Sequence, residues 1–155
     1  MKTKILKLCT TFLLLLPLCV VLLGAGCEKN EELPPFHAKG KIIEVTGGCY
    51  GEIVLIEVET PKEIGLSGTF SYPGDESESL IYKNAIGVPY FQKIGIPDSV
   101  PQTIGTWLYF EYRVLTEEER NQPSLFSTDP PIVCQTIYGP PTAKTFIITK
   151  IISYK

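Results

Sequence analysis

The residues of this chain best placed for covalent chemistry are its five cysteines, and Cys27 stands out among them by its surroundings. Three lysines open the chain, an apolar stretch covers residues 8–23, and a Gly-Ala-Gly triplet directly precedes Cys27. A basic start, an apolar middle and small residues before a cut are typical of a secretory signal peptide. We therefore expect residues 1–26 to be removed, which leaves a thiol at the first mature position.

A cysteine at that position resembles the signal of bacterial lipoproteins, although Gly24 stands where such signals usually place leucine. The resemblance implies that Cys27 forms a thioether to diacylglycerol and that fatty acyl chains such as palmitate hold the protein to a membrane. Ordinary secretion and an uncleaved transmembrane anchor are the alternatives. The apolar stretch nearly reaches the ~20 residues that a membrane span requires. Pro17 and the glycines favour cleavage.

The remaining cysteines indicate a disulfide. Cys9 and Cys19 leave with the signal peptide and Cys27 carries lipid, so that Cys49 and Cys134 remain. An exported protein meets an oxidising environment, where two such thiols tend to pair. We expect a Cys49–Cys134 bridge; two separate buried thiols are the alternative. Because two cysteines lack further ligands at metal-binding spacing, we expect no metal site there.

The charge balance argues against nucleic acid as a partner. The signal peptide contains three of the 14 basic residues and none of the 17 acidic ones, so residues 27–155 have 11 basic and 17 acidic residues and a formal charge of −6. Nucleic-acid affinity depends largely on neutralising phosphates. For the same reason we expect membrane contact through the acyl chains rather than through a basic face.

Residues 27–38 are expected to form the lipidated start and a flexible tether. The segment is charged and contains Pro34-Pro35, and fully extended it reaches up to ~35 Å. Acidic residues directly after the lipidated cysteine resemble the export signal of surface-exposed lipoproteins in some Gram-negative bacteria. The resemblance implies a location in the cell envelope, at the outer membrane and exposed on its surface; a plain soluble spacer is the alternative.

Residues 39–155 have the pattern of one all-β domain. Period-two alternation and turn signals predict strands, which we place at 42–45, 51–59, 80–88, 106–115, 132–138 and 145–154, with a short one near 69–72. Thr116 and Glu119 have the spacing of a capping box, which predicts a short helix that Pro123 stops. Five or six strands with frequent Gly and Pro favour a small barrel or sandwich.

Three strand segments, residues 40–45, 104–113 and 134–138, resemble those of small, largely uncharacterised lipoproteins of Gram-negative bacteria with an OB-like fold. The resemblance implies a five-stranded closed barrel in which Cys49, in the first turn, approaches Cys134 near the final hairpin. A β-sandwich is the alternative, although an immunoglobulin-like one usually needs about seven strands.

The clearest candidate for a ligand site is one face of the strand at 106–115. Trp107, Tyr109, Glu111 and Arg113 alternate with the apolar residues of the other face. OB-like barrels bind oligosaccharides on a strand face and its adjoining loops, and aromatic rings stack on sugars or on apolar side chains. The alternative is packing of these rings beneath a loop or helix.

Catalytic patterns are scarce. The one histidine, His37, falls in the expected tether, where a serine–histidine arrangement would lack a rigid imidazole. No phosphate-binding glycine loop or paired-histidine motif occurs, so we expect neither a cofactor nor a metal. Asp75, Glu76 and Glu78 offer oxygen ligands for calcium without the spacing of a known calcium loop, which favours a solvated loop.

The sequence thus predicts a non-catalytic, lipid-anchored binding or structural module of the cell envelope that recognises a glycan or protein ligand. An accessory envelope subunit without a small ligand is the first alternative. The second is a carboxylate-based hydrolase, which needs two acids within about 5–10 Å of each other in a cleft.

Overall fold

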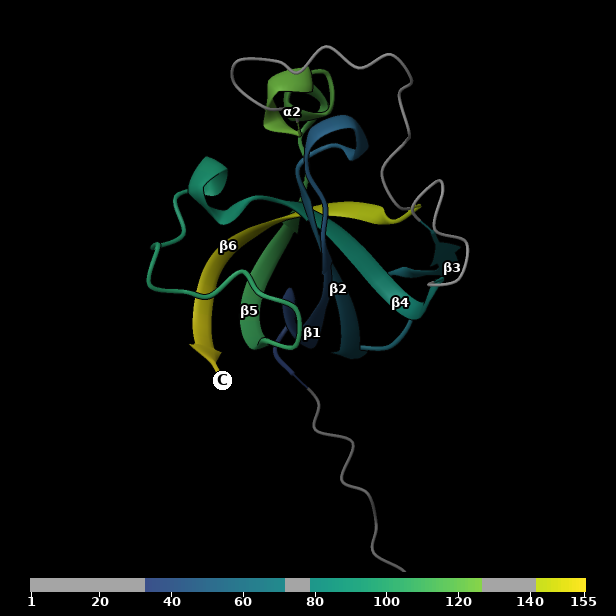
Figure 1. Ribbon diagram of the computed structural model, residues 1–155. Helices are drawn as coiled ribbons and strands as arrows, with labels where there is room; N and C mark the ends of the chain where they lie inside the picture. Colours follow the sequence, from purple (N-terminus) through teal and green to yellow (C-terminus); the bar gives the residue numbers. More distant parts are fainter. Residues whose placement is uncertain (1–32, 72–78, 127–141) are drawn as a thin grey trace, which may run out of the picture. The chain divides into compact units, whose positions relative to one another are not determined.

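The computed structural model describes residues 33–71, 79–126 and 142–155 (Figure 1). Within these ranges the chain consists mainly of strands, joined by short 3-10 turns and one four-residue helix. The strands are β1 (His37–Val45), β2 (Ile53–Thr60), β3 (Leu66–Phe70), β4 (Leu80–Pro89), β5 (Trp107–Val114) and β6 (Lys144–Tyr154). The 3-10 turns are η1 (Gly48–Tyr50), η2 (Phe91–Ile94) and η3 (Pro123–Leu125), and the helix is α2 (Glu117–Arg120).

Five of these strands close into a barrel. The pairs β1–β2, β2–β4, β1–β5 and β5–β6 are antiparallel. A short parallel pairing of β4 with β6, through Ile86–Lys144 and Gly87–Thr145, completes the ring. β3 pairs with β4 outside the ring as an additional strand. The predicted all-β fold with a small closed barrel is therefore confirmed.

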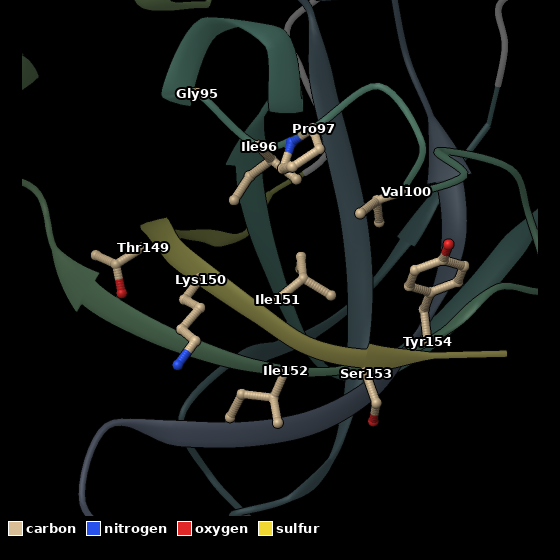
Figure 2. Close-up of a pocket in the computed structure, with 10 residues that line it drawn as sticks. All are labelled: Gly95, Ile96, Pro97, Val100, Thr149, Lys150, Ile151, Ile152, Ser153 and Tyr154. Carbon is tan, nitrogen blue, oxygen red and sulfur yellow. The ribbon is translucent and has the colours of Figure 1, made fainter.

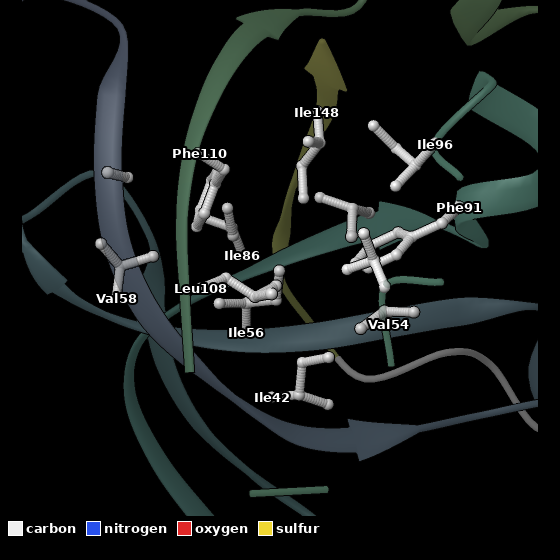
Figure 3. Close-up of a cluster of buried hydrophobic side chains, with 13 residues drawn as sticks. Ile42, Val54, Ile56, Val58, Ile86, Phe91, Ile96, Leu108, Phe110 and Ile148 are labelled. Carbon is white, nitrogen blue, oxygen red and sulfur yellow. The ribbon is translucent and has the colours of Figure 1, made fainter. Parts of the chain in front are cut away.

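The barrel interior follows from the alternation of the strand sequences. Side chains from all five barrel strands meet in one buried cluster (Figure 3), which contains among others Ile42, Val54, Ile86, Phe110 and Ile148. The segment after β4 adds Phe91, Ile96 and Val100 to the same cluster. Since successive strand residues point to opposite faces, the neighbours of these core residues face outward.

β3 covers part of the outer surface, which explains why β2 is apolar on both sides. Leu55, Phe70, Tyr82 and Ala85 form a second buried cluster between β2, β3 and β4. Gly68 on β3 makes this packing feasible, because a Cβ there would lie 2.7 Å from the Tyr82 hydroxyl. The Tyr82 hydroxyl in turn donates a hydrogen bond to the Thr142 carbonyl oxygen (2.8 Å), and burial raises the pKa of this phenol.

The predicted capping box is confirmed at α2. The Thr116 hydroxyl accepts a hydrogen bond from Glu119 N (3.2 Å), and the Glu119 carboxylate accepts one from Thr116 N (2.9 Å). Both reciprocal bonds satisfy donors that the start of a helix leaves unpaired. The helix ends at Arg120, and Pro123 opens η3.

The strands near 42–45, 51–59, 80–88, 106–115 and 145–154 are confirmed with shifted ends, and the short one near 69–72 is found as β3. β1 begins at His37, two residues before the expected domain boundary. The expected strand at 132–138 lies outside the described residues.

Candidate functional site

The outer side of β1, β5 and the end of β6 brings aromatic rings and lysines together. We define the cationic–aromatic face as His37, Lys39, Lys41, Trp107, Tyr109 and Lys155. The β1–β5 register places Lys39 opposite Tyr109 and Lys41 opposite Trp107. On the other side of β5, Trp107 and Lys155 exchange two backbone hydrogen bonds of 2.9 and 3.0 Å.

Trp107 lies between two ammonium groups. The Nζ atoms of Lys41 and Lys155 are 5.9 and 6.0 Å from the centroid of its ring. An ammonium within about 6 Å of an indole is attracted by the ring quadrupole, by ~0.5–1 kcal/mol at exposed sites. The indole is partly exposed, so the condition on which the predicted ligand face depends, that Trp107 is not enclosed, is met.

Tyr109, two residues after Trp107 on β5, also has a lysine beside its ring. Lys39 Nζ lies 5.4 Å from its ring centroid, and the His37 ring lies 5.9 Å away, tilted by 47°. The His37 ring is itself fixed, because its Nδ1 donates a hydrogen bond to the Pro35 carbonyl oxygen (2.9 Å). The expectation that His37 belongs to a flexible spacer is therefore wrong: it opens β1 opposite Glu111.

Glu111 and Arg113 are engaged with charged neighbours. Glu111 Oε1 lies 3.6 Å from His37 Nε2 and 3.7 Å from Lys150 Nζ. Arg113 donates to both carboxylate oxygens of Glu119, at 2.7 and 2.6 Å. Of the four predicted face residues, the structure thus places Trp107 and Tyr109 among lysines and gives Glu111 and Arg113 charged partners.

The Arg113–Glu119 pair shifts the titration of both groups. The hydrogen bonds from Arg113, followed by the one from Thr116 N, lower the pKa of Glu119 from its ordinary value to about 2. The hydrogen bond to Glu119 raises the pKa of Arg113. The bidentate ion pair therefore persists well into the acidic range and fixes the link between β5 and α2.

A depression of about 580 Å³ lies on the cationic–aromatic face. Its lining contains Lys39, Trp107, Tyr109 and Lys155 from that face and one carboxylate, that of Glu59; Leu108, Ser153 and Tyr154 complete it. Ligand sites commonly have volumes of roughly 300–1,000 Å³ and combine apolar surface with a few polar groups. Among the described residues, the lining thus offers a ligand three aromatic rings, two ammonium groups and one acid.

A second depression, of about 470 Å³, lies between β6 and the segment after η2 (Figure 2). Ile96 and Val100 line it from that segment, and Ile151 lines it from β6. Beyond Thr145, no described strand pairs with this edge of β6, because β4 reaches only Lys144 and Thr145. The lining is mainly apolar and carries no predicted site residue.

Contacts around η1 join three segments that connect the strands. Glu52 Oε2 pairs with Lys93 Nζ at 2.6 Å, and Glu52 N donates to the Phe126 carbonyl oxygen at 2.9 Å. Tyr90 donates to the Thr46 carbonyl oxygen, and burial, together with the charge of Glu52, raises its pKa. Cys49 in η1 is disulfide-bonded, and its partner lies outside the described residues. The assignment of that partner to Cys134 stays a prediction.

Several other predicted residues lie outside the described residues: Cys27, Cys134 and the acids Asp75, Glu76 and Glu78. In the part of the chain that the structure describes, no group of three or more His, Cys, Asp or Glu side chains is arranged to hold a metal ion. No described helix is long and apolar enough to cross a membrane.

Sequence reasoning missed the lysines of the face. A net charge of −6 says nothing about where the positive charges lie, and Lys155 is far in the sequence from Lys39 and Lys41. The alternation Lys39-Gly40-Lys41 at the start of a strand was an available signal, because it places two ammonium groups on one side.

Comparisons with known proteins do not assign the chain to a family: no protein-family model matches it, and no curated protein is similar in sequence.

Proposed function

We propose that this protein is an exported, lipid-anchored binding module of the bacterial cell envelope that recognises a glycan or protein ligand on the cationic–aromatic face. The observation that carries the binding role is the depression beside Trp107 and Tyr109, where two partly exposed rings lie among ammonium groups. Its single lining carboxylate favours binding over hydrolysis, since glycoside hydrolysis ordinarily requires a pair of acids.

The anchor rests on the residues around Cys27. Replacing Cys27 with serine should remove the acylation site, because an alcohol does not form the thioether. Each buried methylene contributes about 0.8 kcal/mol to membrane binding, so losing two or three acyl chains should release the protein from the membrane fraction. Mass spectrometry of the mature N-terminus, with fractionation of wild type and variant, checks this. An unmodified thiol at residue 27 with the signal peptide retained would reject the anchor.

The binding role predicts that Trp107 controls recognition. Full-length protein purified in a neutral detergent is applied to an array of neutral and acidic glycans and envelope proteins. Trp107→Ala should reduce binding to the recognised ligand by about tenfold or more, since aromatic anchors in desolvated pockets often account for 2 kcal/mol or more. Val114→Ala, on the same strand at an exposed position, is the matched control. Equal binding by wild type and Trp107→Ala would contradict the proposed face.

An accessory envelope subunit is the second candidate, and the second depression favours it. Ile152 and Tyr154 are 39% and 47% exposed beside the unpaired stretch of β6. Such a strand edge accepts an extended segment of a partner through main-chain hydrogen bonds. Binding on the array that is unchanged in Trp107→Ala but lost in Ile152→Lys would favour this candidate.

A further inference from the structure

The charges around Trp107 indicate a narrower class of ligand than the glycan or protein proposed above. This inference rests on the proposed binding function. Lys41 on β1 and Lys155, directly after β6, approach the indole from the two sides of β5, at 5.9 and 6.0 Å from its centroid. Within the described part of the chain, neither lysine lies within 4.0 Å of a carboxylate oxygen. Two ammonium groups held beside one ring therefore have no anionic partner of their own there.

We propose that the cationic–aromatic face binds an acidic oligosaccharide, whose sugars stack on Trp107 and Tyr109 while their carboxylates pair with the lysines. Hydrogen bonds to charged groups are about twice as strong as neutral ones. A carboxylate brought to Lys41 and Lys155 gains such bonds and does not have to displace a carboxylate of the described chain. The rings supply the apolar surface that the faces of pyranose rings contact.

The formal charge of −6 on residues 27–155 sharpens the argument for an acidic ligand. An acidic polymer is repelled by most of such a surface, so its binding is confined to the place where positive charge is concentrated. Lys39 and Lys155 line the depression, whose described lining contains one acid, Glu59, and Lys41 adds a third ammonium group beside Trp107. Electrostatic complementarity of this kind determines specificity and register.

The pairing of the strands argues against an extended peptide as the ligand. β5 is paired with β1 on one edge and with β6 on the other, so its main-chain groups are occupied where Trp107 and Tyr109 lie. Recognition on this face must therefore use side chains. Nucleic acid is disfavoured because three lysines on an acidic protein neutralise few phosphates.

The test compares polygalacturonate with its fully methyl-esterified form, which differ in charge but share the same sugar chain. Affinities are measured by calorimetry with full-length protein in a neutral detergent. We expect the affinity for the acid to exceed that for the ester by about tenfold or more, because the acid makes two charge-assisted contacts. Raising the salt concentration from about 0.05 M to about 0.5 M should weaken the binding of the acid and not that of the ester, because salt screens charge pairs.

Variants distinguish the lysines from the rings. The double variant Lys41→Gln, Lys155→Gln should bind polygalacturonate about tenfold more weakly and the ester with unchanged affinity. Trp107→Ala should lower the affinity for both. Lys83→Gln with Lys144→Gln is the control: it makes the same change in net charge at exposed positions outside the face.

Equal affinity for acid and ester, or equal effects of the two double variants, would overturn the inference. Binding of poly-L-glutamate in place of polygalacturonate would overturn the saccharide class. No binding of any probe would also overturn the inference. The proposed function is judged separately, by whether Trp107→Ala loses the ligand found on the array of neutral and acidic glycans and proteins.

Discussion

Replacing Cys134 with alanine should lower the thermal midpoint of the oxidised protein by roughly 15 °C. A bridge from residue 49 to residue 134 closes a loop of 85 residues, which restricts the unfolded chain by about 4–5 kcal/mol in the loop-entropy model. For a domain of this size, each kcal/mol corresponds to roughly 3–5 °C. Circular dichroism melting of wild type and variant, with and without reductant, measures the effect.

The bridge predicts a specific pattern across these measurements. Reduced wild type should have the same thermal midpoint as the Cys134→Ala variant. Cys49→Ala should lower the midpoint by the same amount as Cys134→Ala, and the double variant should lower it no further. The contact from Glu52 N to the Phe126 carbonyl oxygen brings the chain close to η1 eight residues before Cys134. Equal midpoints for the oxidised wild type and the Cys134→Ala variant would reject this pairing.

Phe110→Ala should reduce the free energy of unfolding by about 3–5 kcal/mol, the usual cost of removing a buried aromatic side chain. Phe110 is fully buried in the barrel core, where its ring meets Tyr112 edge to face at a centroid distance of 6.3 Å. Urea denaturation followed by fluorescence measures the change.

Tyr109→Ala is the matched control, because it removes a ring from the adjacent position on the opposite face of β5. Its loss should be about 1 kcal/mol, mainly the attraction between the ring and Lys39. Similar losses for Phe110→Ala and Tyr109→Ala would mean that the outer ring packs as core, which would contradict a role in ligand binding.

The sequence predicts the strand content well because the alternation of apolar and polar residues can be recognised within each strand alone. The alternation around Leu108, Phe110 and Val54 identifies the core face of β5 and β2 without reference to any other part of the chain. The capping box at Thr116 is local in the same sense, since all its atoms lie within four residues.

Features that depend on the partner strand could not be predicted in this way. Whether Lys41 or Lys39 lies beside Trp107 depends on the β1–β5 register. Lys155 reaches the same ring because β6 pairs antiparallel with β5 and ends beside Trp107. Irregularities add to this difficulty: the β5–β6 register shifts between Tyr109 and Phe110 and again between Glu111 and Tyr112.

His37 shows the same limit from the other direction. Its neighbours Pro34 and Pro35 indicate an extended tether, and nothing nearby in the sequence indicates a strand. The partner Glu111 is distant in the sequence, and with the pairing of β1 to β5 the strand begins at His37, five residues before the strand predicted at 42–45.

The position of β1 has a mechanical consequence for the proposed anchor. Its first residues pair with β5, and its pairing with β2 begins at Lys39. A pull transmitted through residue 37 therefore acts along the strand and loads both hydrogen-bond ladders together, in shear, instead of opening one bond after another. Under the proposed anchoring, the strand that takes the tension is thus one that is paired along both of its edges.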